Sequence, residues 1–477
     1  MTQPALRVPQ SERMRRLCFT FLALAAVCLG QSASPESTRV YTDHPRLFLR
    51  AQRLRLLRRE TGRDSLRWEQ FRLLISGGAP MTEPGFANAL YFRATDDPAA
   101  ARRAIDWAMA PNRDARQVAL VYDWCRDQLK PAEKQALLET LRKTASQRAA
   151  NPALGDLRSQ LLAAIAIAGD DDPVSQAALQ YVLHQWTENL LPALKAGKLE
   201  WKPGDTYPLY EIFHAVRDNL NLDLREDFPG YFKQFPLFDL LSYYPPPYPA
   251  AENEFHIPWS PVGSPVIGEP DLKVAALSRA AELAMVALDT NAPESQVLQG
   301  WLMNDRFLMR GVYGIPYEFL WANPYQPGLS YYHVPLVMYD ETFGRLLVRS
   351  SWGDDALWAG FIGGQLQEFR EGRVVVIDPK TAREPLELDE ATILFPAQSK
   401  HFVSGVKPEN DVFVLGLDRS ASFHVEPDDE EMQEVSTDQA GVLYLKGVRP
   451  QVAVRLTRRP VNLPQSIEAG PPAATNR

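Results

Sequence analysis

Cysteine is scarce in this chain, which has three in 477 residues. Cys18 and Cys28 lie in an N-terminal segment that we expect to be removed, so Cys125 alone remains in the mature chain. No disulfide can then form within the molecule. Because Cys125 ends the apolar sequence VALVYDWC, we expect this thiol to be packed in a core.

Several motifs of catalysis and cofactor binding are also missing. The sequence has no CxxC, HExxH or EF-hand pattern, no glycine-rich phosphate loop and no GxSxG elbow. We therefore predict neither a metal site nor a cofactor. Two acidic runs, at residues 170–172 and 428–431, are expected to be solvated turns, with weak calcium binding as the alternative.

A basic block is missing as well. The formal net charge is −8 at pH 7, from 51 Lys and Arg against 59 Asp and Glu. This balance argues against a nucleic acid as the main partner. The hydrophobic share of 45% and the charged share of 23% are typical of a globular protein with real cores.

The first apolar segment is typical of an export signal. The basic residues at 14–16 precede an uncharged apolar run at 17–29 and the small residues at 30–33. The run is shorter than the roughly 20 residues that span a membrane, and no later segment is apolar enough to span one. We predict a signal peptide at residues 1–33, no integral membrane span in the mature chain, and a periplasmic or extracellular location. A buried helix, a membrane anchor and a lipoprotein processed at Cys28 are the alternatives.

Helical periodicity dominates residues 40–330. Apolar residues recur at spacings of three and four, and proline or aspartate separates the segments. The clearest predicted helices cover residues 65–75, 99–109, 115–129, 132–149, 157–168, 173–194 and 272–288. Short connections between so many helices indicate antiparallel neighbours packed on one another.

Strand patterns replace the helical ones between residues 335 and 460. The predicted strands cover residues 345–351, 356–362, 373–377, 411–417, 421–425, 441–445 and 452–456. Such short runs, separated by turn residues, predict an antiparallel β-sandwich. The tail at 461–477 is expected to be disordered.

Residues 301–332, between the two regions, are dense in aromatics. This density favours either a packed interdomain layer or a platform for stacking sugar rings.

Short motifs along residues 44–364 resemble, in the same order, those of heparinase II/III-like proteins. They are HPRLFL at 44–49, YDWC at 122–125, LKPAE at 129–133, LREDFPGYF at 224–232, EFLW at 318–321 and LLVRSSWGDDA at 346–356. The resemblance implies an incomplete (α/α) toroid over residues 40–330, followed by an antiparallel β-sandwich over residues 335–460. It also implies a lyase that cleaves uronate-containing polysaccharides by β-elimination. In that reaction the uronate carboxylate is neutralised, a base removes the C5 proton, and an acid protonates the leaving O4.

Residues 201–214, WKPGDTYPLYEIFH, carry groups suited to this chemistry. Asp205 or Thr206 is expected to cap a helix that has Pro208 in its first turn. One side of this helix is an apolar stripe, formed by Leu209, Ile212, Phe213, Val216 and Leu220. The opposite side is a polar face, formed by Tyr207, Tyr210, Glu211, His214 and Asp218. The alternative is a solvated face without a function.

Two tyrosines and a histidine are the catalytic candidates. Tyr210 is the first candidate for proton transfer, with His214 as its partner or as a neutraliser of the carboxylate, and with Tyr207 as the third. The candidates for substrate contact are Lys202, Glu211, Arg217, His256, Trp321 and His333.

Two departures from the family pattern bear on catalysis. Pro203 stands where a glutamate is usual, and Gly363-Gly364 precede QLQEFREG in place of a histidine-rich stretch. No histidine lies between His333 and His401. The sequence therefore leaves open a degenerate protein that binds glycan without cutting it. A glycoside hydrolase with two carboxylates is a third hypothesis.

Overall fold

The computed structural model describes residues 39–199, 203–245, 256–259, 272–304, 311–397, 401–403, 410–427, 431–449 and 453–458. The predicted signal peptide at 1–33, the candidate Lys202 and the tail at 461–477 lie outside these residues.

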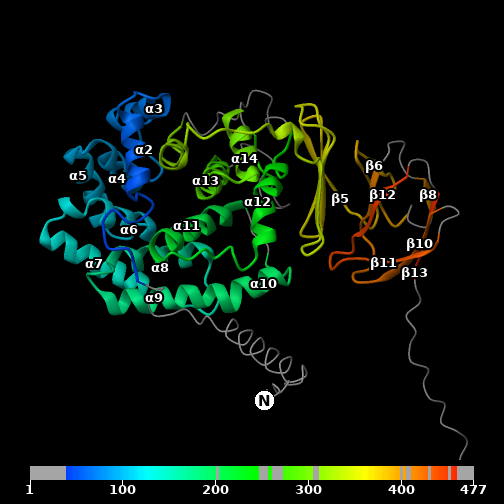
Figure 1. The fold of residues 1–477 in the computed structure, drawn as a ribbon, viewed down its shortest axis with the longest axis horizontal. Helices are drawn as coiled ribbons and strands as arrows, with labels where there is room; N and C mark the ends of the chain where they lie inside the picture. Colours follow the sequence, from blue (N-terminus) through cyan, green and yellow to red (C-terminus); the bar gives the residue numbers. More distant parts are fainter. Residues whose placement is uncertain are drawn as a thin grey trace, which may run out of the picture.

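Helices fill the first part of the described chain and strands fill the last part (Figure 1). This order confirms the predicted fold class. The helices are α2 (Ala51–Thr61), α3 (Leu66–Ser76), α4 (Pro84–Thr95), α5 (Pro98–Met109), α6 (Ala115–Trp124), α7 (Pro131–Ala145), α8 (Leu154–Ile167), α9 (Asp172–His184), α10 (Leu191–Lys195), α11 (Pro203–Leu220), α12 (Pro229–Leu241), α13 (Leu272–Leu288), α14 (Pro293–Asn304) and α15 (Ile315–Trp321).

Alternate helices pack side by side in an inner ring. α4 contacts α6, α6 contacts α8, α8 contacts α11, α11 contacts α13, α13 contacts α15, and α15 returns to α4. α5, α7 and α9 pack on helices of this ring, and the chain colours run around it from blue to green in Figure 1. The inner helices are largely buried, and every residue of α6 after Ala115 is buried. This arrangement is an (α/α) toroid.

Several helices differ in their bounds from the sequence prediction: the helix predicted at 115–129 ends at Trp124, and the one predicted at 132–149 ends at Ala145. The helix predicted at 173–194 is divided by a π-helical turn, Gln185–Leu190, between α9 and α10. α11 begins at Pro203, so the predicted cap at Asp205 or Thr206 is wrong, and Pro208 lies inside the helix. A proline at that position removes one backbone donor without ending the helix.

The strands form three sheets. They are β1 (Val337–Asp340), β2 (Arg345–Arg349), β3 (Trp358–Ile362), β4 (Gln365–Arg370), β5 (Arg373–Ile377), β6 (Leu386–Glu387), β7 (Ala391–Leu394), β8 (His401–Val403), β9 (Asn410–Val414), β10 (Ser422–Pro427), β11 (Gln433–Ser436), β12 (Leu443–Val448) and β13 (Ala453–Arg458). The first sheet has the order β1-β2-β3-β4-β5, the second β12-β9-β7-β6 and the third β11-β10-β13-β8. The described pairs are antiparallel except β7 with β9.

The second sheet is packed between the other two. Phe413 of β9 shares a core with Phe361 of the first sheet, whereas Val412 and Val414 share a core with Val454 of the third. Because successive side chains of a strand point to opposite faces, both faces of β9 are buried. The apolar run at residues 412–414 within this strand is consistent with this position.

The helical region and the first sheet share a core. Phe238 and Leu241 of α12 and the adjacent Tyr244 pack against Leu347 and Trp358. The Trp358 indole donates to the carbonyl of Leu241 at 2.9 Å. Of the helices that the structure describes, none combines the length and the apolar composition needed to cross a bilayer.

Candidate functional site

The predicted polar face of α11 lies inside the protein. Tyr207 and Glu211 are 0% exposed, and Tyr210 and His214 are 2% exposed. α11 belongs to the inner ring and contacts α8 and α13, so neighbouring helices cover the face that an isolated helix would turn to solvent. These four side chains lie in three different environments.

Tyr207 and Glu211 belong to a buried ion-pair network. Arg116 donates from Nε to both carboxylate oxygens of Glu211, at 2.8 and 2.9 Å, and Arg158 donates to the same carboxylate at 3.1 Å. Arg116 also donates to the Tyr207 hydroxyl at 3.1 Å, and Trp321 Nε1 donates to it at 3.1 Å. Burial, together with the Glu211 charge, raises the pKa of Tyr207 well above its usual value. This hydroxyl stays protonated and both of its acceptor positions are occupied, which suits a structural role.

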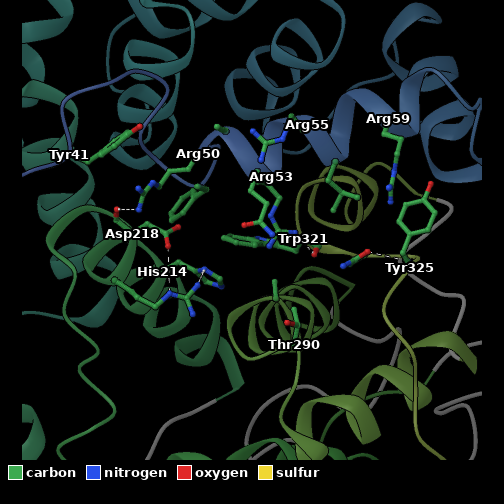
Figure 2. Close-up of a pocket in the computed structure, with 17 residues that line it drawn as sticks. Tyr41, Arg50, Arg53, Arg55, Arg59, His214, Asp218, Thr290, Trp321 and Tyr325 are labelled. Atoms are coloured by element: carbon green, nitrogen blue, oxygen red, sulfur yellow. Dashed lines mark hydrogen bonds and ion pairs between the residues drawn. The ribbon is translucent and has the colours of Figure 1, made fainter.

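His214 lines a large cleft between α2, α11 and the segment after α15 (Figure 2). The cleft has a volume of about 1030 Å³. Its described lining contains five arginines and a single carboxylate, that of Asp218. We call it the basic cleft, and its arginines are Arg50, Arg53, Arg55, Arg59 and Arg217.

Three of these arginines bond to backbone carbonyls. Arg53 donates to the carbonyl of Trp321 at 2.8 Å, Arg50 to that of Asp218 at 2.6 Å, and Arg217 to that of Leu288 at 2.6 Å. A carbonyl satisfies the N–H group but supplies no opposite charge; of the three, Arg217 also lies 3.6 Å from the Asp218 carboxylate. Burial lowers the pKa of Arg53 to about 10, so its guanidinium stays charged at neutral pH. The basic cleft therefore keeps a positive charge.

Arg55 and Arg59 lie one turn apart on α2 and are both exposed. Arg55 has no bonding partner among the residues that the structure describes. Arg59 lies over the ring of Tyr325, with 3.6 Å between the guanidinium carbon and the ring centroid. These two side chains are the cations of the cleft most available to a ligand, and Figure 2 shows them on the same helix as Arg53.

The tautomer of His214 is fixed by its neighbours. Nε2 lies 2.9 Å from the carbonyl oxygen of Ala284, which can only accept, so Nε2 carries the proton. Nδ1 is then an acceptor, 3.5 Å from Arg217 Nη2. Burial, followed by the charge of Arg217, lowers the pKa of His214 well below its usual value. The imidazole is neutral at physiological pH and cannot itself neutralise a carboxylate.

Most aromatic rings in the basic cleft are covered, although Tyr325 is 44% exposed. Trp321 is 2% exposed and packs on Phe48, with ring centroids 5.3 Å apart. Arg50 lies 4.3 Å from the Tyr41 ring centroid, and Arg59 lies over the Tyr325 ring. The cleft therefore offers mainly charge to a ligand, with the exposed Tyr325 ring as its available aromatic surface.

Tyr210 does not reach the basic cleft. It lines a separate cavity with Asp223, Arg225 and Asp289, and its ring is stacked on Phe235. Burial raises the pKa of the Tyr210 hydroxyl. The structure thus does not bring Tyr210 and His214 together as the predicted proton-transfer pair.

A further cavity, of about 230 Å³, lies where the helical region meets the first sheet. We call it the aromatic pocket, and its lining includes His256, Trp301, Asn304, Tyr331, Tyr332, Arg349 and Trp352. Tyr331 and Tyr332 are stacked with 4.6 Å between centroids. Arg349 is 3% exposed and donates to the carbonyl of Tyr243 at 3.1 Å. Burial lowers the pKa of Arg349 to about 10.

His256 is the predicted substrate-contact residue that reaches the aromatic pocket. Burial, followed by the charges of Arg279 and Arg349, lowers the pKa of His256 to about 4. Its imidazole is therefore neutral at pH 7. His333, by contrast, is exposed at the end of a 3₁₀ turn and lines neither cavity.

The arginines of α2 are the residues that sequence reasoning missed. A signal was present, because residues 50–59 contain five arginines. Arg58 pairs with Asp96 at 3.0 Å outside the cleft, whereas the other four line it.

Comparison of the sequence with models of known protein families gives no match, and comparison with curated protein sequences gives none either. The relation to heparinase II/III-like proteins therefore remains a hypothesis based on the short motifs.

Proposed function

We propose that this protein is exported and binds an acidic polysaccharide in the basic cleft. The observation that carries the proposal is the gathering of five arginines around one carboxylate, in a chain whose formal net charge is −8. A positively charged cleft in a chain of negative net charge favours an anionic ligand. The charged groups of acidic glycans are carboxylates and sulfates. Arginine binds both through paired N–H donors.

The size of the basic cleft supports a ligand of several sugar units. Its volume of about 1030 Å³ lies at the upper end of the range for small-molecule sites. The predicted signal peptide and the resemblance to heparinase II/III-like proteins both favour a polysaccharide over other polyanions.

The chemistry along α11 favours binding over cleavage. Tyr207 is saturated by hydrogen bonds, Tyr210 opens on another cavity, and His214 has a low pKa. A hydrolase needs two opposed carboxylates, but the described lining of the cleft supplies only Asp218.

The test is direct binding of heparin, chondroitin sulfate and alginate oligosaccharides by calorimetry. Replacing both Arg55 and Arg59 by alanine is expected to weaken binding by about 10- to 100-fold, because two charge-assisted contacts are lost. Arg58→Ala is the matched control on the same helix, since its guanidinium pairs with Asp96 outside the cleft. Equal effects of the control and the double variant would contradict the proposal. So would equally tight binding of single-stranded DNA of the same charge.

β-Elimination in the aromatic pocket is a second candidate function. The observation that favours it is one cavity shared by His256, Tyr331 and Arg349, which supply a neutral base, a hydroxyl and a cation. Absorbance of unsaturated uronate products measures the reaction. Product that is lost in Tyr331→Phe and retained in Tyr210→Phe would support it, whereas no product on any uronate glycan would exclude it for these substrates.

A further inference from the structure

The cavity that contains Tyr210 differs in charge from the basic cleft. It has a volume of about 210 Å³ and lies between α11, α12 and the end of α13. Its described lining contains four carboxylates, from Asp223, Glu226, Asp289 and Glu294, against the two basic groups of Arg225 and Lys233. We call it the Tyr210 pocket.

The wall of this pocket contains a hydroxyl without a partner. Tyr210 is 2% exposed, and its ring is held edge-on against Phe213 and stacked on Phe235. Its hydroxyl makes no hydrogen bond to any described residue. The hydroxyl oxygen is also not fully enclosed by protein atoms. It therefore opens on the cavity beside it. Buried polar groups in proteins are nearly always bonded, so an unpartnered hydroxyl that lines a cavity indicates a missing ligand or water.

A second hydroxyl lines the same cavity. Ser295, at the start of α14, is 3% exposed and also has no hydrogen-bond partner among the described residues. Phe232, Pro236 and Met285 add an apolar surface. The pocket thus combines two hydroxyls with an apolar wall, as in sites that orient a small organic molecule.

The charges around the pocket do not cancel. The guanidinium of Arg225 lies between two carboxylates, with Nε 2.9 Å from Asp223 Oδ1 and Nη2 3.2 Å from Asp289 Oδ1. Because two anions surround one cation, this group leaves a negative excess. Lys233 lies 3.8 Å from Glu294, but its side chain is 70% exposed and screens that carboxylate weakly. Glu226 is exposed and adds a further negative charge.

We propose that the Tyr210 pocket binds a compact organic cation, a primary amine of monosaccharide size such as an amino sugar. The ammonium group lies toward the carboxylates, and the ligand's hydroxyls bond to Tyr210 and Ser295. The volume suits one sugar ring and is too small for a polymer chain. This site is independent of the basic cleft and of the function proposed for it.

Calorimetry or saturation-transfer NMR with glucosamine, using glucose as the uncharged control, tests this inference. Glucosamine is expected to bind saturably, and glucose at least about 10-fold more weakly, because it lacks the charge. Tyr210→Phe removes only the hydroxyl and is expected to weaken glucosamine binding by about 3- to 10-fold. The melting temperature of the same variant should be unchanged, because the removed hydroxyl has no described hydrogen-bond partner, and this shows that the variant is folded.

Glu226→Gln provides an independent variant at an exposed position, where folding is not at risk. It is expected to weaken glucosamine binding and to leave glucose unaffected. Equal binding of glucosamine and glucose would overturn the proposal. So would the absence of saturable glucosamine binding, or full binding by both variants.

Discussion

The indole of Trp321 lies against the imidazole of His214, with 4.4 Å between the ring centroids. The same indole donates to the hydroxyl of Tyr207. Trp321 therefore separates the basic cleft from the buried network around Arg116, and both depend on its position.

Replacement of Trp321 by alanine is expected to destabilise the protein by about 3–5 kcal/mol, since the side chain is 2% exposed and its packing on Phe48 and His214 is lost. Urea unfolding measures the loss. Tyr332→Ala is the control, because that ring is 62% exposed and its removal should cost less than about 1 kcal/mol. Similar losses for the two variants would contradict the structural role of Trp321.

Glu211→Gln is expected to cost about 3–5 kcal/mol, because Arg116 and Arg158 would keep their charges without the buried carboxylate. The same change at Glu139, whose side chain is 52% exposed, should cost less than about 0.5 kcal/mol. Thermal unfolding of both variants compares them directly. A neutral effect at Glu211 would show that the network does not carry this stability.

Stability is expected to fall between about pH 6.5 and pH 4 through His256. An unfolded imidazole takes up a proton below about pH 6.5, whereas burial keeps the folded imidazole neutral down to about pH 4. Protonation then favours the unfolded state by up to about 3 kcal/mol at the acid end. His256→Gln should flatten this part of the stability profile, and NMR titration of the ring should give the low pKa. A His256 that titrates near pH 6.5 would refute the prediction.

Replacing either of two helical glycines by alanine is expected to change the stability of the protein, in opposite directions. A Cβ on Gly300 would lie 1.9 Å from the carbonyl oxygen of Leu329, so Gly300→Ala must displace the chain and destabilise the fold. A Cβ on Gly155 would meet nothing within 4 Å, so Gly155→Ala should stabilise α8 by about 0.5–1 kcal/mol. Melting temperatures of the two variants give the signs. A rise for Gly300→Ala would show that the contact with Leu329 is not tight.

The sequence predicted elements well where periodicity decides them. α13 has the predicted bounds, and α5 begins one residue before its prediction. All seven predicted strands overlap observed strands, but six described strands were missed: β1, β4, β6, β7, β8 and β11. Of these, β4 covers Gln365–Arg370. Only Leu366 and Phe369 of this strand are large apolar residues, and charged or amide side chains separate them. Its pairing with β3 and β5, which a local pattern does not contain, makes it a strand.

The candidate site was harder to predict, for a physical reason. The polar residues of α11 suggested a single chemical face, but Arg116 and Arg158, from other helices, neutralise part of it. Partners so distant in sequence leave no local signal. The arginines of α2 left a signal, yet an arginine-rich helix is normally solvated, and only the packing of α2 near α11 and α15 forms a cleft beneath it.

The packing of α15 on α3 and α4 has a consequence for how the helical region folds. Arg67 lies 3.5 Å from Glu318, and Trp68 lies 5.5 Å from Phe319 between ring centroids. These contacts join parts of the chain roughly 250 residues apart, so closing the ring costs more chain entropy than packing helices that are neighbours in sequence. A chain that ends before α15 leaves the aromatic side of α3 uncovered and prone to association. The toroid is therefore expected to gain its stability in one late step, unlike an open solenoid that grows repeat by repeat.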